Sequence, residues 1–346
     1  MVYLFLTGNR SAYLNAIFTV MSMPKGIVYD LKYRDLENRS IVDNSAKSFD
    51  EKSQEKVLLL FNDEHGGYVP LRFGSLKRWK KEEGQIYYSV RMGEYCNDIR
   101  NEKLCEFIDE IAPEKIRIID IDGEGHGILA FLAEREPGRL LEKKQDSWSK
   151  VVRKLGEKAL FKKYYSVFTK IQITEKGSEV EVNDKIVLKT EHNYMIRMTY
   201  YIPDFNAVPM EYIPVQFYES DKSLGIIEMM NALLSEQNVI EILCSTVKKD
   251  VGNQKNAFRY EILKERINGK IVQYARTPIE VEVKGNLSKK IYYFLTIMAI
   301  ILLGVANFLN SAIIDENSSK VLTAAISGVI TLVTWLMIKL IGKPKI

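Results

Sequence analysis

Two uncharged apolar runs close to the C-terminus constrain the fold of this chain more than any other feature. The first covers residues 291–314 and the second covers residues 321–338, and neither contains a formal charge. At a rise of about 1.5 Å per residue, each run is long enough to cross the hydrocarbon core of a bilayer as a helix. A short polar turn at 315–320 separates them. The sequence therefore predicts a C-terminal transmembrane hairpin.

The charges around this hairpin predict its orientation. The turn between the two runs carries Asp315, Glu316 and only one lysine, whereas both outer flanks are rich in lysine. Lysine-rich flanks tend to stay on the cytoplasmic side of a membrane. The flanking residues are Lys284, Lys289, Lys290, Lys339, Lys343 and Lys345. We therefore expect both termini, and everything that precedes the hairpin, in the cytoplasm.

Polar residues recur at helical spacing in both runs. Hydroxyl and amide side chains within a membrane tend to face protein or water, and they can bond between helices. Two interpretations stay open: the polar residues join the helices of a passive anchor, or they line an opening between several copies of the chain. The candidate pore or helix-contact residues are Asn307, Asn310, Thr323, Ser327, Thr331 and Thr334.

Length and charge set limits on the remainder of the chain. About 285 of the 346 residues precede the hairpin, which is enough for two domains. The formal charge of the chain is +4, and residues 284–346 contribute +5 of it, so residues 1–283 carry −1. This balance argues against a body that binds nucleic acid through bulk charge. Three widely spaced cysteines are typical of reduced thiols in the cytoplasm.

Short β-favouring segments separated by polar or glycine-bearing turns dominate the body. We expect an α+β fold with β-rich cytoplasmic domains, followed by the transmembrane hairpin. The predicted domains are an N-terminal α+β domain at 1–162, a small sheet or barrel with helices; a β-sandwich-like domain at 163–285; and the hairpin at 286–346. Only four residues, 285–288, separate the last predicted strand from the lysines at the membrane.

No motif for catalysis or metal binding is complete. The glycine-rich loop at 120–127 lacks the glycine spacing and the Lys-Ser/Thr end of a phosphate-binding loop, so we interpret it as a tight turn. The histidines, His65, His126 and His192, lie far apart, with no ligand neighbours at metal-site spacing. We therefore predict no enzyme, no cofactor and no metal. A weaker alternative is an enzyme that uses this loop.

A basic run with an aromatic residue is the strongest candidate for ligand binding. Residues 77–81 read Lys-Arg-Trp-Lys-Lys, and Arg72 precedes them. Such a run could bind a phosphorylated ligand or a single-stranded oligonucleotide, with the indole stacking on a base. A solvated hairpin turn is the other interpretation, since two glutamates follow the run. The candidate ligand-binding residues are Arg72, Lys77, Arg78 and Trp79.

A β-rich body that ends in a two-helix hairpin, with no catalytic signature, resembles the two-transmembrane effectors of bacterial anti-phage defence systems, such as the Hailong-type channel effector. The resemblance implies location in the bacterial inner membrane and assembly into a homo-oligomer. It also implies that a nucleotide, oligonucleotide or protein regulator acts on the body and controls an ion-permeable pore. The alternative is a membrane-tethered binding or scaffold protein with a passive anchor in the lipid bilayer.

Overall fold

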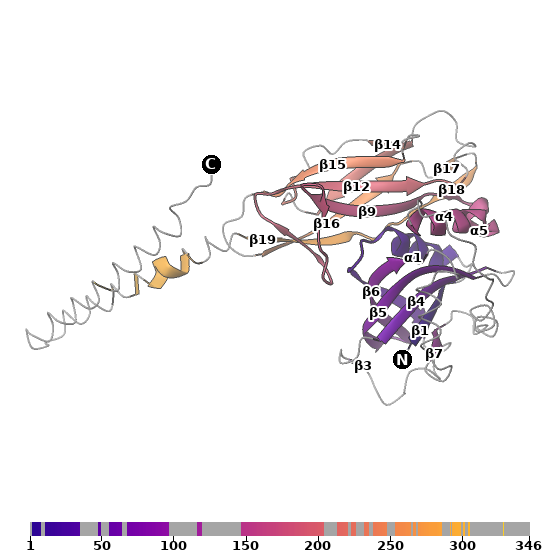
Figure 1. The fold of residues 1–346 in the computed structure, drawn as a ribbon, viewed down its shortest axis with the longest axis horizontal. Coiled ribbons are helices and arrows are strands. Elements are labelled where there is room, and N and C mark those ends of the chain that lie inside the picture. Colours follow the sequence, from indigo (N-terminus) through magenta and orange to yellow (C-terminus); the bar gives the residue numbers. More distant parts are fainter. Residues whose placement is uncertain are drawn as a thin grey trace, which may run out of the picture.

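A computed structural model shows two β-rich parts joined by short helices (Figure 1). The structure describes residues 2–7, 11–34, 48–49, 55–63, 68–96, 116–119, 147–203, 213–220, 223–225, 232–234, 238–247, 253–263, 266–267 and 269–285, together with 291, 293–298, 300–301, 304 and 328.

The N-terminal part is a mixed sheet in the order β2-β6-β5-β4-β1-β7, with the short β3 paired to β5. Its strands are β1 (Val2–Thr7), β2 (Val28–Arg34), β3 (Ser48–Phe49), β4 (Glu55–Asn62), β5 (Tyr68–Glu82), β6 (Gln85–Tyr95) and β7 (Ile116–Ile119). The central strands β1 and β4 are continuous apolar runs and pair in parallel, as strands buried on both faces do. Within the described residues the sheet is open, not a closed barrel.

The long strands β5 and β6 form a hairpin that extends beyond the rest of the sheet. Its two-residue turn, Glu83 and Gly84, has positive φ angles of 49° and 73°, which the right-handed twist of a β-hairpin favours. The pairing slips between Arg72 and Gly74 and again between Leu76 and Arg78. The second slip puts an extra residue into β5 and so changes which residues of β5 share a face of the sheet.

Helix α1 (Ser11–Ser22) lies between the N-terminal sheet and the second part (Figure 1). Leu14, Ile17, Phe18 and Met21 recur at helical spacing and are fully buried. The helix contacts β9 (Phe168–Glu175) of the second part as well as β1 and β5. Two further helices, α4 (Ser147–Glu157) and α5 (Ala159–Lys163), follow in sequence and connect the two parts.

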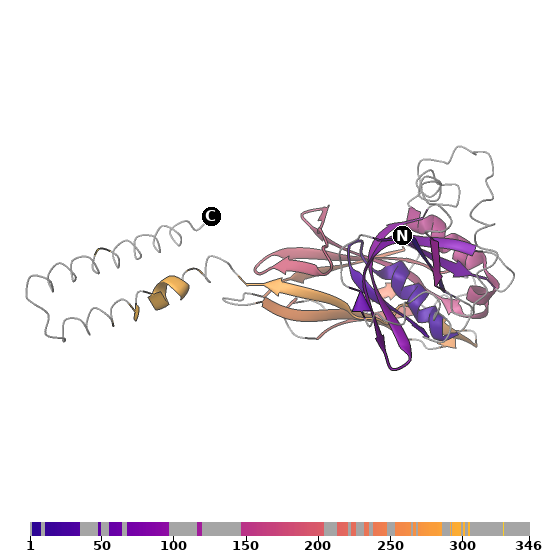
Figure 2. The ribbon, with the colours of Figure 1, turned by 90° about the horizontal axis from the view of Figure 1, so that it is seen from below.

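The second part consists of two sheets that face each other, with a small three-stranded sheet beside them (Figure 2). The first sheet has the order β10-β9-β12-β15 and the second has the order β11-β19-β16-β13-β14, while β17, β18 and β8 form the small sheet. The strands are β8 (Tyr165–Ser166), β9 (Phe168–Glu175), β10 (Ser178–Glu179), β11 (Ile186–Lys189), β12 (Asn193–Tyr201), β13 (Ile213–Glu219), β14 (Ala232–Leu234), β15 (Val239–Ser245), β16 (Asn253–Ile262), β17 (Arg266–Ile267), β18 (Lys270–Gln273) and β19 (Ile279–Lys284).

The core of this part follows from alternation along the strands. In β12, Tyr194, Ile196, Met198 and Tyr200 are buried and the residues between them are not. Such alternation is typical of a strand with one face on a core. The hydroxyls of Thr169 and Tyr260 form a buried hydrogen bond between the two facing sheets. The β-rich character predicted for the body is confirmed.

The predicted transmembrane hairpin is contradicted. Among the residues that the structure describes, no helix combines the length and the apolar character needed to cross a bilayer. The longest, α1, has 12 residues, about 18 Å at 1.5 Å per residue, and it is buried in protein. The predictions of an inner-membrane location, a channel and a pore depended on the hairpin and are corrected with it. The six pore candidates between Asn307 and Thr334 lie outside the described residues.

Candidate functional site

The four residues of the predicted ligand site lie on two faces of β5 and do not meet. Arg72 is fully buried and Trp79 is 8% exposed, whereas Arg78 is exposed. The slip in pairing between Leu76 and Arg78 places Lys77 at a bulge and shifts the side-chain alternation by one residue. The indole of Trp79 therefore packs in the core and does not stack on a ligand.

Arg72 is a structural residue that braces the end of α1. Its Nη1 donates to the carbonyl oxygens of Val20 and Met23, at 2.9 and 2.6 Å, and its Nε donates to that of Gly93 at 2.8 Å. Burial lowers the pKa of this guanidinium from its ordinary value. The ring of Tyr95 lies 4.2 Å from the guanidinium carbon. A cation at this end of a helix also complements the helix dipole.

Lys77 belongs to the joint between the two parts of the molecule. Its Nζ lies 3.8 Å from Oδ1 of Asp184, and Nη2 of Arg91 lies 2.6 Å from the same oxygen. The backbone of Asp184 is bound as well, because its N–H donates to the carbonyl of Gly26 and its carbonyl accepts from the N–H of Val28. Asp184 thus ties the second part to the outer edge of the N-terminal sheet.

Three neighbouring strands place two lysines on either side of a tyrosine on the outer face of the sheet. Lys32 of β2 and Lys80 of β5 are both directly opposite Tyr87 of β6. Their ammonium nitrogens lie 5.6 and 5.3 Å from the ring centroid, within the range of a cation–π contact. Because backbone pairing fixes all three strands, the row presents two cations and a phenol from a rigid surface.

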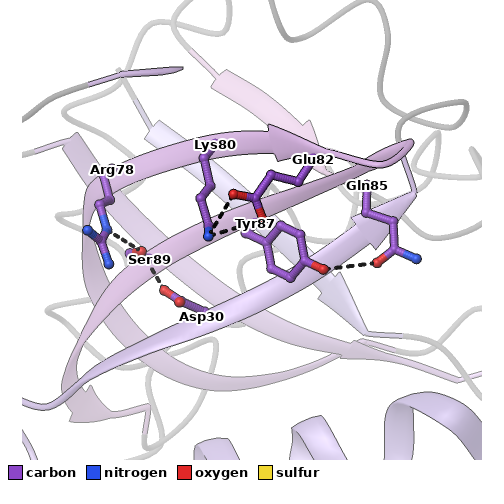
Figure 3. A network of polar contacts seen from close by, with 7 residues as sticks. All are labelled: Asp30, Arg78, Lys80, Glu82, Gln85, Tyr87 and Ser89. Carbon is purple, nitrogen blue, oxygen red and sulfur yellow. Dashed lines mark hydrogen bonds and ion pairs between the residues drawn. The ribbon is translucent and has the colours of Figure 1, made fainter. Parts of the chain in front are cut away.

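A second row next to the first orients an arginine. Arg78 Nε donates to Ser89 Oγ at 3.0 Å, and the Ser89 hydroxyl donates to a carboxylate oxygen of Asp30. Figure 3 shows Asp30, Ser89 and Arg78 across the same three strands as the lysine row. The hydrogen bond from Arg78 to Ser89 holds the guanidinium in place. Ser89 itself is closed to solvent, because it is only 3% exposed. The free N–H groups of a guanidinium suit phosphate or carboxylate oxygens.

Two polar contacts complete this face (Figure 3). Lys80 Nζ is 3.1 Å from Glu82 Oε1, and the hydroxyl of Tyr87 donates to Gln85 Oε1 at 3.4 Å. We call the surface formed by Asp30, Lys32, Arg78, Lys80 and Tyr87 the basic face. The basic face carries three positive charges and one negative charge, that of Asp30, so its net charge is positive. Glu82 at the rim lowers this net charge. Such a surface can bind a small anion.

A cleft of about 570 Å³ lies where the basic face ends and the second part begins. One wall is formed by residues 73–75 and 91–93 of the sheet with Lys25 and Gly26, and the other wall is formed by residues 179–182. This volume lies within the range of about 300–1,000 Å³ that is usual for ligand pockets. Arg91 reaches both the cleft and the joint with Asp184.

Other candidates from the sequence are not brought into this site. His192 lies in the second part, where its Nδ1 is 2.6 Å from Glu175 Oε1 and lowers the pKa of that carboxyl. The loop at 120–127, with His126, and also His65 lie outside the described residues. No group of residues in the described part of the chain could hold a metal ion.

Sequence reasoning missed Lys32 and Tyr87. A signal exists for the tyrosine, because polar residues alternate with apolar ones from Gln85 to Met92, which marks one outward face. Lys32 carries the same signal, because Asp30 and Lys32 alternate with Leu31 and Tyr33, but only the pairing of β2 with β6 brings it opposite Tyr87.

The sequence matches no known family model and no curated protein. The resemblance to two-transmembrane defence effectors therefore remains a prediction.

Proposed function

We propose that this chain is a binding protein that recognises a small phosphorylated ligand on its basic face. The observation that carries the proposal is the row of Lys32, Tyr87 and Lys80, which places two ammonium groups, one from each strand beside β6, around one half-buried aromatic ring. Arg78 lies in the next row and adds a guanidinium that is already oriented. Preorganised cations lose little conformational freedom when an anion binds.

The chemistry of these groups favours phosphate. Lysine ammonium groups act as point charges toward phosphate oxygens, and a guanidinium can donate two parallel hydrogen bonds to them. The Nε of Arg78 donates to Ser89, and this hydrogen bond orients the guanidinium and its two terminal nitrogens. The phenol of Tyr87 supplies a ring face and a hydroxyl for the rest of the ligand.

The charge balance favours a small ligand over a nucleic-acid polymer. Residues 1–283 carry a net charge of −1, and Asp30 and Glu82 border the three cations of the basic face. A long polyanion binds through a continuous positive field, which this balance does not supply. One or a few phosphate groups need only the local cluster.

The contacts of Ser89 support binding in preference to catalysis. A serine beside a carboxylate is an arrangement found in some nucleophiles. Here the hydroxyl is buried, donates to Asp30 and accepts from Arg78, so it is used in positioning the arginine. We expect no covalent chemistry at this hydroxyl.

Isothermal titration of the full chain with inorganic triphosphate tests the proposal, with adenosine triphosphate as a second titrant. Replacing Lys32 and Lys80 together with alanine should weaken triphosphate binding by at least about tenfold, because two phosphate contacts are lost. Lys162→Ala is the matched control, since this exposed lysine lies on α5, away from the basic face. Equal binding by the double variant and the control would contradict the site. Tighter binding of adenosine triphosphate would show that the nucleoside contributes.

A further inference from the structure

The wall of the interdomain cleft at residues 179–182 is the continuation of an edge strand. β10 lies at the end of its sheet, paired only with β9. The two strands are joined by a tight turn at Lys176 and Gly177, whose φ angles are 51° and 83°. Four consecutive residues, 179–182, line the cleft. Successive side chains of an extended segment point to opposite sides, so the segment presents its backbone edge to the cleft.

The register of the hairpin shows which backbone groups are available. Ser178 is opposite Glu175 and Glu179 is opposite Thr174, and the N–H of Val180 donates to the carbonyl of Ile173 at 2.8 Å. In an antiparallel pair, alternate residues direct their N–H and C=O groups toward the partner strand and away from it. The backbone groups of Glu179 therefore point away from β9. No strand of the described chain pairs with them.

The charges of the cleft indicate the character of a ligand. The cations on the sheet wall are engaged, because Lys25 pairs with Glu94 and Arg91 pairs with Asp184. On the other wall Glu179 and Glu181 are exposed, and the nearest polar contact of the former is Gln172 Nε2 at 3.5 Å. The charge that the cleft offers is thus negative. Val180, Val182 and Phe73 also line the cleft, and the two valines pack against the core.

We propose that this cleft receives an extended peptide segment of a partner protein, which adds as a strand beside residues 179–181 and carries basic side chains toward Glu179 and Glu181. Addition of a strand to an open sheet edge is a common mode of peptide recognition, in which backbone bonds give affinity and alternate side chains give specificity. A second copy of this edge is disfavoured as the occupant, because pairing would bring like charges together. The inference does not depend on the phosphate site.

The test is fluorescence polarisation of the full chain with a labelled six-residue peptide of alternating lysine and valine. Two further peptides serve as probes: one with alternate backbone nitrogens methylated, and one with glutamate in place of lysine. The chain variant Glu179→Lys/Glu181→Lys reverses the charge of the cleft wall. Glu157→Lys is the matched control, because this exposed glutamate lies on α4, outside the residues that line the cleft.

Saturable binding of the lysine peptide is expected, with at least about tenfold weaker binding after backbone methylation, since a methylated nitrogen can no longer donate a hydrogen bond to the open edge. The charge-reversed variant should also lose about tenfold and should gain affinity for the glutamate peptide. Absence of saturable binding, or equal binding of the methylated peptide, would overturn the inference. The variant with alanine at Lys32 and Lys80 should bind the peptide normally, which separates this result from that of the phosphate titration.

Discussion

The two faces of β5 use the same residue types for different purposes. On the inner face, Arg72 is fully buried and joins the end of α1 to the sheet, and Trp79 packs in the core. On the outer face, Arg78 and Lys80 are exposed and belong to the basic face. The role of a basic residue on a strand therefore does not follow from its residue type alone. Its role depends on which side of the sheet the local register gives it.

Truncating Trp79 should give the largest effect and separates the faces most clearly. We expect Trp79→Ala to lower the free energy of unfolding by about 4 kcal/mol, because a buried indole is lost and a cavity is left. Tyr87→Ala on the outer face should cost only about 1 kcal/mol, the usual scale of a cross-strand pair. Urea denaturation followed by circular dichroism measures both. Similar losses for the two variants would show that the faces are not distinct.

The two arginines give the next largest difference. Arg72→Met should lower the free energy of unfolding by about 3 kcal/mol, because carbonyls of Val20, Met23 and Gly93 lose their donor in a buried place. Arg78→Met should change it by less than about 0.5 kcal/mol, as is usual for an exposed residue. Urea denaturation again provides the measurement. A larger loss for the outer arginine would reverse the assignment.

The joint at the end of the basic face can be tested with two glycines of positive φ. A Cβ at Gly26, where φ is 92°, would lie 2.1 Å from the carbonyl oxygen of Val182, whereas one at Gly84 would meet nothing within 4 Å. Gly84→Ala should cost about 1 kcal/mol through backbone strain alone. Gly26→Ala should cost about 2 kcal/mol, because the two parts of the molecule must also separate there. Thermal denaturation of the two variants measures the difference. Equal decreases in melting temperature for Gly26→Ala and Gly84→Ala would mean that the contact between Gly26 and Val182 does not contribute to stability.

Ser89 should show the smallest effect, since its hydroxyl joins two residues of the outer face, Arg78 and Asp30. Ser89→Ala removes the hydroxyl between Arg78 and Asp30 and should lower the free energy of unfolding by about 1 kcal/mol. The arginine would then lose its orientation, so triphosphate binding should weaken severalfold. Parallel denaturation and titration measure the two effects. Stability loss with unchanged affinity would remove Arg78 from the proposed site.

Much of the β-rich body could be predicted from local pattern. The apolar run of β4 and the alternation in β12 are visible in the sequence, because burial on two faces or on one face sets their period. The basic run at 77–81 was also visible, but its division between two faces was not. A bulge near Leu76 shifts the alternation, and bulges depend on pairing with β6.

The sequence by itself determined that this chain is rich in strands, that its N-terminal body carries little net charge, and that a basic run lies near Trp79. Only the tertiary structure decided that this indole is buried, that Lys32 and Lys80 meet around Tyr87, and that residues 179–182 form a wall of a cleft. It also contradicted the predicted hairpin, for which length and hydropathy were the sole basis. Local patterns record the environment of each strand, whereas strand order and register bring together residues that are distant in sequence.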